Sequence, residues 1–244
     1  MIPNDPSKAI IAALEAAPSG PPMSRPWWCP GCKKPRPYGT TCEGCAPVVR
    51  RQSRAEGLAP ALATVPGMFR DARFDVVSQR AAAPGIARAR AAVADLGTHP
   101  RVIFEGPPGC GKTTLAVCML HAVIDRALDP DADIEHWRRA TSAMYVRAYS
   151  LAKANVEAPL GETVALVERC RTASVLVIDE LGGEPKGLLR NPIPDVLDER
   201  HGEPGRWTIV TTGLDQEKLE SLYGGGIARR LYEYAQVIEP GKLL

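Results

Sequence analysis

Short apolar runs alternate with longer segments of helical pattern over most of the chain. Five such runs predict strands, and they occupy residues 101–105, 143–148, 174–180, 206–212 and 235–240. Strands that alternate with helices are typical of a parallel sheet covered by helices. We therefore expect an α/β domain built on a parallel five-stranded sheet.

The first part of the chain has a different pattern. An Ala-rich stretch at residues 8–17 predicts a short helix, and a linker rich in Pro follows it. A second helix is predicted around residues 48–56, directly before the breaker pair Gly57 and Pro60. We place the main domain boundary between Ala55 and Ala63.

Length and composition allow one full domain with a small appendage, because the 244 residues are 45% hydrophobic. No run approaches the roughly 18 apolar residues of a membrane span, and the N-terminus does not resemble a secretory signal. We expect no membrane association and a cytoplasmic location. The net charge is +2, and the first 56 residues hold eight Lys and Arg against four Asp and Glu. This modest excess permits contact with nucleic acid but is more typical of a solvated face.

A phosphate-binding loop directly follows the first predicted strand. Gly106, Gly111, Lys112 and Thr113 match the pattern G-x-x-x-x-G-K-[ST] between a strand and a helix. Glycines let backbone N–H groups turn toward phosphates, and the helix points its positive end at them. Lys112 is expected at the β- and γ-phosphates of ATP and Thr113 on Mg²⁺. The predicted nucleotide-binding residues are Gly106, Pro107, Pro108, Gly109, Cys110, Gly111, Lys112, Thr113 and Thr114.

An acidic pair ends the third predicted strand, at the edge where open parallel sheets bind ligands. Asp179 follows four apolar residues and fits the Mg²⁺ site, while Glu180 fits the base that polarises the attacking water. The run at residues 143–148 falls between this strand and the phosphate loop in the sequence. Together with Glu180, it indicates an ATPase with an inserted central strand rather than a nucleotide kinase.

These segments together resemble the AAA+ ATPases of the DnaC/IstB type, which include bacterial helicase loaders and transposition helper ATPases. The resemblance runs from about Val65 to Pro240 and is more specific than the phosphate loop alone. It adds four segments: residues 65–75, which would help to wall the adenine; residues 175–182, the Walker B strand; residues 196–212, a helix and the sensor strand; and residues 223–233, the box with the arginine finger.

The resemblance assigns further roles by position. Thr212 falls at the tip of the sensor strand, and Arg230 falls at the arginine finger, with Arg229 as a rival. Supplied to a neighbouring subunit, such a finger makes hydrolysis depend on assembly, which implies a homo-oligomer. Arg200 matches a recurrent family arginine without a role that we can assign; a surface arginine is the alternative for all three. Where the family usually has Asn, this chain has Gly213, so either a neighbouring threonine substitutes or hydrolysis is weak.

Four cysteines near the N-terminus form two C-x₂-C pairs separated by nine residues: Cys29, Cys32, Cys42 and Cys45. Two such turns present four thiolates to one ion, so we expect a compact zinc knuckle. Four thiolates fill the coordination shell, which indicates structural Zn²⁺. A redox pair or disulfides are the alternatives.

The expected organisation has three parts. Residues 1–56 would hold the N-terminal helix, the linker and the zinc module; residues 57–100 a linker and the adenine-side segment; and residues 101–244 the AAA+ ATPase domain. The chain ends at Leu244, soon after the last predicted strand, which predicts little or no helical lid.

The resemblance implies a helicase loader that hydrolyses ATP, binds ssDNA and delivers a replicative helicase gripped by its zinc module. A transposition helper that coats duplex DNA, or an adaptor that ATP switches with little hydrolysis, are the alternatives. Residues 136–153 place aromatic and basic side chains near the second strand, where DNA contact competes with a simple solvated helix.

Overall fold

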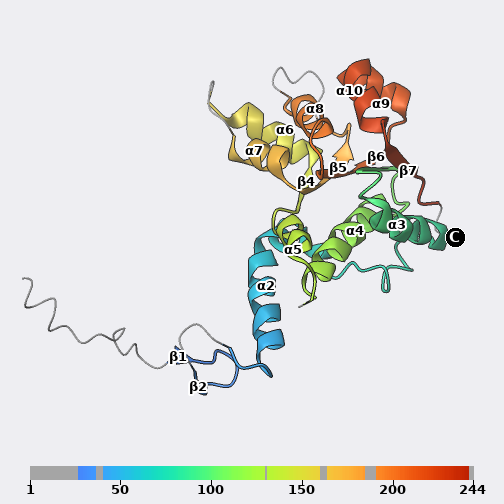
Figure 1. Cartoon of the computed structure of the whole chain (residues 1–244). Helices are drawn as coiled ribbons and strands as arrows, with labels where there is room; N and C mark the ends of the chain where they lie inside the picture. Colours follow the sequence, from blue (N-terminus) through green and yellow to red (C-terminus); the bar gives the residue numbers. More distant parts are fainter. Residues whose placement is uncertain (1–26, 37–40, 130, 160–163, 185–190, 242–244) are drawn as a thin grey trace, which may run out of the picture. The chain divides into compact units, whose positions relative to one another are not determined.

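The computed structural model describes residues 27–36, 41–129, 131–159, 164–184 and 191–241 (Figure 1). The chain divides into two compact units, Met1–Arg50 and Arg51–Leu244. The helix predicted at residues 8–17 lies outside the described residues, and the predicted division at residues 56 and 100 stays a prediction. Within the described segments, no helix has the length and apolar character needed to cross a bilayer.

The second unit is built on the predicted sheet. Its five strands are β3 (Arg101–Glu105), β4 (Met144–Arg147), β5 (Val175–Leu181), β6 (Trp207–Thr212) and β7 (Ala235–Ile238). They lie in the order β4-β5-β6-β3-β7, and every neighbouring pair is parallel. The parallel five-stranded sheet is therefore confirmed. The strand inserted between the phosphate-loop strand and the acidic strand is β6, whereas β4 forms an edge of the sheet.

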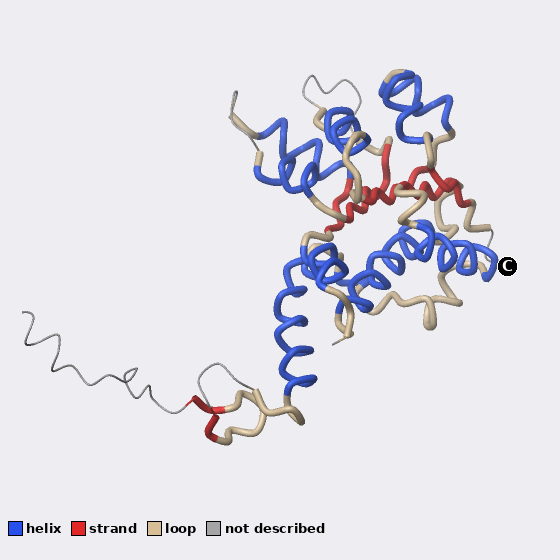
Figure 2. Tube along the Cα trace, in the orientation of Figure 1, coloured by secondary structure: helices blue, strands red, loops and turns tan. Residues whose placement is uncertain are grey.

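Helices cover both faces of this sheet, and Figure 2 shows the strands between two helical layers. The cause lies in the alternation of side chains along each strand. On β3, Val102 and Phe104 enter one buried cluster with α3 (Ala83–Asp95) and α4 (Lys112–Ala127), whereas Ile103 enters the other. The helices of the second layer are α6 (Ala148–Glu157), α7 (Ala165–Thr172), α8 (Ile193–His201), α9 (Gln216–Tyr223) and α10 (Gly225–Tyr232).

The breaker pair does not end a helix. Helix α2 (Ala46–Ala63) runs through Gly57 and Pro60, so the sequence prediction of a break there is wrong. Leu58, between these two residues, is buried in the core. Its packing stabilises this turn of α2 by more than the loss of the backbone hydrogen bond at Pro60 destabilises it. A Cβ on Gly57 would lie 3.1 Å from the Trp137 ring, so the glycine permits a close helix contact with α5 (Ile134–Thr141).

Arg200 is a buried structural residue, so the alternative of a surface arginine is wrong for this position. Its guanidinium donates to the main-chain oxygens of Cys170 at 3.0 Å, Ala173 and Trp207 at 2.7 Å, and to Thr208 Oγ1 at 3.0 Å. Burial lowers the pKa of Arg200 to about 9, so it keeps its charge at neutral pH. The side chain joins the end of α7 to the start of β6.

The first unit contains a small antiparallel hairpin, in which β1 (Trp27–Trp28) pairs with β2 (Pro35–Arg36). The loop between these strands turns at Lys33, whose φ is 57°. Cys29 N donates to Lys34 O and Lys33 N donates to Cys29 O, each at 2.9 Å. These bonds close a tight turn around the first cysteine pair.

Candidate active site and metal centre

The loop at residues 106–113 joins β3 to α4 and bends through three glycines with positive φ. Gly106, Gly109 and Gly111 have φ values of 145°, 79° and 90°, which favour glycine. Gly111 is also the N-cap of α4, and a Cβ there would lie 2.5 Å from the main-chain oxygen of Arg80. The loop therefore needs glycine for both conformation and space, and it presents the positive end of a 16-residue helix.

The first residues of α4 carry the polar groups of the loop. Lys112 Nζ donates to the main-chain oxygens of Gly106 at 2.7 Å and Pro107 at 2.8 Å, which hold the ammonium group over the loop. Thr113 Oγ1 donates to Asp179 Oδ1 at 2.8 Å. The predicted phosphate loop and the predicted acidic strand thus meet at one hydrogen bond.

Asp179 is buried and takes donors from three elements. Besides Thr113, Thr211 Oγ1 donates to Oδ1 at 2.6 Å from the end of β6, and the Tyr145 hydroxyl donates to Oδ2 at 2.6 Å from β4. Burial first, and then the bond to this carboxylate, raises the pKa of Tyr145. The sequence prediction did not include Tyr145. The one available signal was a tyrosine, with its polar hydroxyl, in a mostly apolar predicted strand.

Glu180 sits at an irregular point of the sheet. The register between β5 and β6 shifts between Ile178 and Leu181, and Glu180 takes a φ of 59°. A bulge of this kind re-aims a side chain, and positive φ in a non-glycine residue is a strained conformation. The backbone N–H of Glu180 donates to Thr211 Oγ1 at 2.9 Å, and its side chain is exposed. Glu180 therefore faces away from buried Asp179 although the two are adjacent.

A cavity of about 770 Å³ lies over the loop and the carboxyl ends of the central strands. It brings together most of the predicted nucleotide and catalytic residues: Pro108, Gly109, Gly111, Lys112, Thr113, Thr114, Glu180 and Thr212. Gly106, Pro107 and Cys110 line a neighbouring cavity of about 510 Å³ instead. The segment expected to wall the adenine contributes Met68 and Phe69, and Gln79 and Arg80 extend that wall.

The end of β6 holds two threonines with different partners. Thr211 bonds Asp179, as described above, whereas Thr212 Oγ1 donates to Leu181 O at 2.9 Å and accepts from Leu214 N at 3.0 Å. Gly213 also lines the cavity. The threonine that touches the acidic strand's carboxylate is thus Thr211, and the catalytic role predicted for Thr212 stays a prediction.

The two finger candidates lie on α10, outside the lining of the 770 Å³ cavity. The Arg230 side chain is 37% exposed and forms an ion pair with Asp198. The Arg229 side chain is 68% exposed and lies 3.6 Å from Glu233. Neither reaches the phosphate loop of its own chain, and a finger that acts on a neighbouring subunit does not need to.

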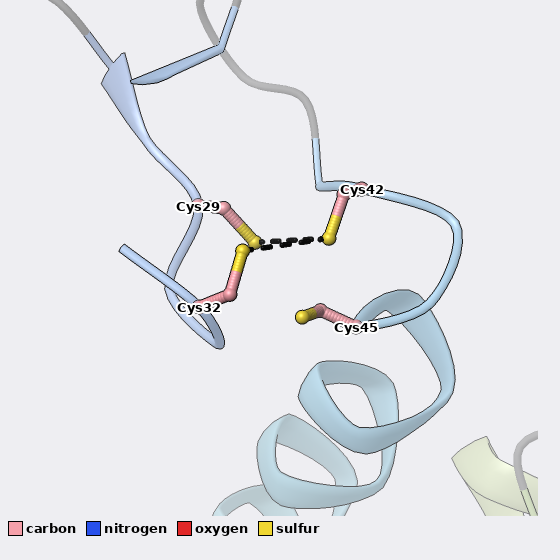
Figure 3. Close-up of side chains that lie close together, drawn as sticks. All are labelled: Cys29, Cys32, Cys42 and Cys45. Atoms are coloured by element: carbon pink, nitrogen blue, oxygen red, sulfur yellow. Dashed lines mark hydrogen bonds between the residues drawn. The ribbon is translucent and has the colours of Figure 1, made fainter. Parts of the chain in front are cut away.

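The four N-terminal cysteines point toward a common centre (Figure 3). Their sulfur atoms all lie within 4.8 Å of one another. Cys42 Sγ lies 3.6 Å from Cys29 Sγ and 3.7 Å from Cys32 Sγ. In a tetrahedral site with Zn–S bonds of about 2.3 Å, the sulfurs lie about 3.8 Å apart. The cluster therefore fits a zinc knuckle.

The surroundings of the cluster favour a cation. The backbone N–H of Cys32, followed by that of Cys42, lowers the pKa of Cys29 to about 6. Contacts with the neighbouring thiols, Cys42 first, raise the pKa of Cys45 to about 12. A divalent ion would relieve this crowding, since thiolates are its ligands. A Cβ on Gly31 would lie 2.9 Å from Cys45 Sγ, so glycine is needed for the approach.

Comparison with solved structures identifies the fold of this protein. No protein-family model and no curated protein matches the sequence. The crystal structure of the DnaC helicase loader is similar with a TM-score of 0.53 at 20% identity, over 72% of this chain and 100% of that one. The chain has the DnaC-like AAA+ fold. A crystal structure of DnaI is also similar to this protein, with a TM-score of 0.50 at 18% identity, over 76% of this chain and 93% of DnaI.

Metal analysis of this AAA+ chain should find one Zn²⁺ per chain, bound by the four thiolates. Cys45→Ser should weaken Zn²⁺ binding by about a hundredfold or more, because loss of a direct ligand exceeds the 10- to 100-fold cost of losing an outer partner. Competition with a colorimetric chelator measures this affinity. Cys110→Ser, which removes a thiol outside the cluster, is the matched control. Equal Zn²⁺ content and affinity in all three proteins would contradict the assignment.

Proposed function

We propose that this protein is an ATP-dependent loader of a replicative helicase, which acts in the cytoplasm and binds ssDNA. The observation that carries the proposal is the likeness to the DnaC helicase loader, which extends over the whole of that chain. The sequence resemblance to DnaC/IstB-type ATPases supports it independently. The meeting of the phosphate loop with the acidic strand, at the bond from Thr113 to Asp179, supports the use of a nucleotide.

The cavity over the phosphate loop has the size and the polarity that a nucleotide needs. Its volume of about 770 Å³ lies within the usual range of about 300–1,000 Å³ for ligand sites. Lys112 and the N-terminus of α4 supply positive charge for phosphates at one end. Met68 and Phe69 supply apolar surface at another part of the wall, where a base can pack. We assign this cavity to ATP.

The oxygen donors beside the loop suit Mg²⁺, a hard cation that prefers such ligands. We assign Thr113 Oγ1 and Asp179 to its site, because the two are already in contact at 2.8 Å. When bound, Mg²⁺ neutralises charge on the β- and γ-phosphates. Glu180 is the exposed carboxylate on the same cavity and would accept the proton of the attacking water.

Assembly would complete the site. An arginine from a neighbouring subunit places a guanidinium against charge that develops on the γ-phosphate. We assign this role to Arg230, whose side chain is 37% exposed and would have to leave Asp198, with the 68% exposed Arg229 as the rival. We therefore propose a homo-oligomer in which Arg230 acts in trans.

The zinc module is the proposed grip on the helicase. Trp28 is 54% exposed and Val48 is 66% exposed in this unit. Large apolar side chains at the surface of so small a unit are typical of a contact surface. Zn²⁺ would hold the module folded, since binding to such sites is worth on the order of 10 kcal/mol.

One observation favours a second function, an adaptor that ATP switches with little hydrolysis. Gly213 stands where the family usually has Asn and offers no side chain to the cavity. The hydroxyl protons of Thr211 and Thr212 are both donated within the protein. In this version, ATP serves mainly to assemble the subunits. The transposition helper remains the other alternative, and DNA preference separates it from a loader.

Turnover measurements separate the loader ATPase from the adaptor. Glu180→Gln should slow hydrolysis of ATP by about a hundredfold or more while nucleotide still binds, because a general base contributes roughly that factor. Lys112→Ala should lose both binding and turnover. Phosphate release and binding of a fluorescent ATP analogue measure the two steps. Equal, negligible rates in the wild type and both variants would leave the adaptor as the function.

Tyr145→Phe should raise the Mg²⁺ concentration needed for half-maximal nucleotide binding by about tenfold. The lost hydroxyl donates to Asp179 Oδ2 and so holds the carboxylate in place. Titration of Mg²⁺ at fixed fluorescent ATP analogue measures the shift. Binding in excess chelator should not change, which a general folding defect would not predict. Tyr149→Phe removes a hydroxyl from a half-exposed ring and is the matched control. Identical titrations for both variants would exclude the Mg²⁺ role assigned to Asp179.

Binding to DNA and capture of a partner test the loader itself. With ATP present and at constant salt, the full chain should bind ssDNA at least about tenfold more tightly than a duplex of equal length. The immobilised chain should retain a hexameric helicase, and Trp28→Ala should reduce that retention. Preference for duplex together with recovery of a transposase would reverse the choice between loader and transposition helper.

A further inference from the structure

A separate cavity of about 540 Å³ opens at the end of the sheet opposite the phosphate loop. It is lined by the residues that begin two strands, Arg101 on β3 and Trp207 on β6, and by Tyr234 just before β7. Because the strands are parallel, their first residues lie at the edge away from the loop that follows Glu105. This cavity shares no lining residue with the proposed ATP cavity.

Arg101 is a buried cation with unused donors. Its residue is 7% exposed, and in the described segments it makes one hydrogen bond, from Nε to Glu233 O at 2.8 Å. A guanidinium has five N–H donors, and no acceptor for its two terminal amino groups is found among the described residues. Burial lowers the pKa of Arg101, as expected for a charge removed from water. Neither terminal nitrogen is among the described buried nitrogens that lack a partner, so both are accessible from the cavity, where an anion can pair with them.

The rest of the wall is also basic. Arg139, Arg206 and His201 line the cavity, and the acidic residue in the lining is Glu203. Glu203 lies 3.8 Å from Arg206 and offsets that cation. From outside the lining, Glu135 lies 3.4 Å from Arg139 and Glu233 lies 3.4 Å from His201. The described segments show no carboxylate within 4.0 Å of the Arg101 guanidinium, but the Glu233 carboxylate lies close enough to interact with it electrostatically.

Two aromatic rings, those of Trp207 and Tyr234, also line this cavity. Arg139 lies over the Trp207 ring, 4.2 Å from its centroid. Tyr234 is 67% exposed and has a φ of 56°, a conformation that costs energy outside glycine. It stands close enough to Arg101 for an electrostatic interaction. An exposed ring beside a buried guanidinium offers stacking and phosphate binding at one place.

We propose that this cavity binds the phosphate of a nucleotide unit, with Arg101 as its ligand and Tyr234 stacked against the base. The volume suits one nucleotide, and a guanidinium pairs with a phosphate through two parallel bonds. The nucleotide unit is either part of a single strand of nucleic acid or a free mononucleotide. The site does not depend on the ATPase; as a contact for a single strand it rests on the ssDNA binding proposed above, and as a site for a free mononucleotide it lies beyond that function.

The test uses the full chain carrying Lys112→Ala, so that the phosphate loop does not bind the probes. One probe is fluorescein-labelled oligo(dT), followed by anisotropy at two salt concentrations; the others are dTMP and inorganic phosphate, followed by calorimetry. Tyr234→Ala, Arg139→Gln and Arg101→Met are added singly to this background. Lys218→Gln removes an exposed cation on α9, which follows the opposite end of β6, and is the matched control.

Tyr234→Ala and Arg101→Met should each weaken binding about tenfold, Arg139→Gln less, and Lys218→Gln less than twofold. Arg101→Met should also lower the salt dependence by about one phosphate contact. Loss with oligo(dT) alone identifies a nucleic-acid strand, and the same loss with dTMP or phosphate identifies a free nucleotide. Unchanged affinity for every probe in Tyr234→Ala and Arg139→Gln overturns the proposal, whether or not Arg101→Met folds.

Discussion

A buried carboxylate is tolerated only where donors surround it, and Asp179 takes its donors from three separate elements. Thr113 comes from α4, Thr211 from β6 and Tyr145 from β4. The same three bonds fix the phosphate loop against the ends of two other strands. The position of the loop and the placement of the buried carboxylate are therefore one constraint.

The fold could be predicted from the sequence mainly because β3, β4, β5 and β6 are buried along most of their length, whereas β7 is partly exposed. Such strands read as short unbroken apolar runs, and the five predicted runs all became strands. Their spatial order could not be read in the same way. Residues 143–148 precede β5 in the chain and pair with it at the sheet edge, whereas β6 follows β5 and inserts beside β3. That order depends on pairing between distant segments, which no local pattern contains.

The candidate site also contains residues that a local sequence pattern reveals and residues whose roles depend on distant partners. The glycines of the phosphate loop are a local requirement, since Gly111 needs both a positive φ and space beside Arg80, and the motif reveals them. Tyr145 and Arg200 act through partners more than 25 residues away or on other elements, so their roles emerge only in three dimensions. Pro60 is the opposite case: its local rule predicts a helix end, and burial of the neighbouring turn overrides that rule.

The end of β6 limits how the proposed ATPase can work alone. A hydroxyl has one proton to donate, and Thr211 gives its proton to Asp179 while Thr212 gives its proton to Leu181 O. Gly213 has no side chain to add. No hydroxyl proton at the carboxyl end of this strand remains for a γ-phosphate, so stabilisation of the charge in the transition state would come from Lys112, from Mg²⁺ or from a second subunit. Because the first two would already serve to bind ATP, the neighbour's arginine is the group that would separate hydrolysis from binding.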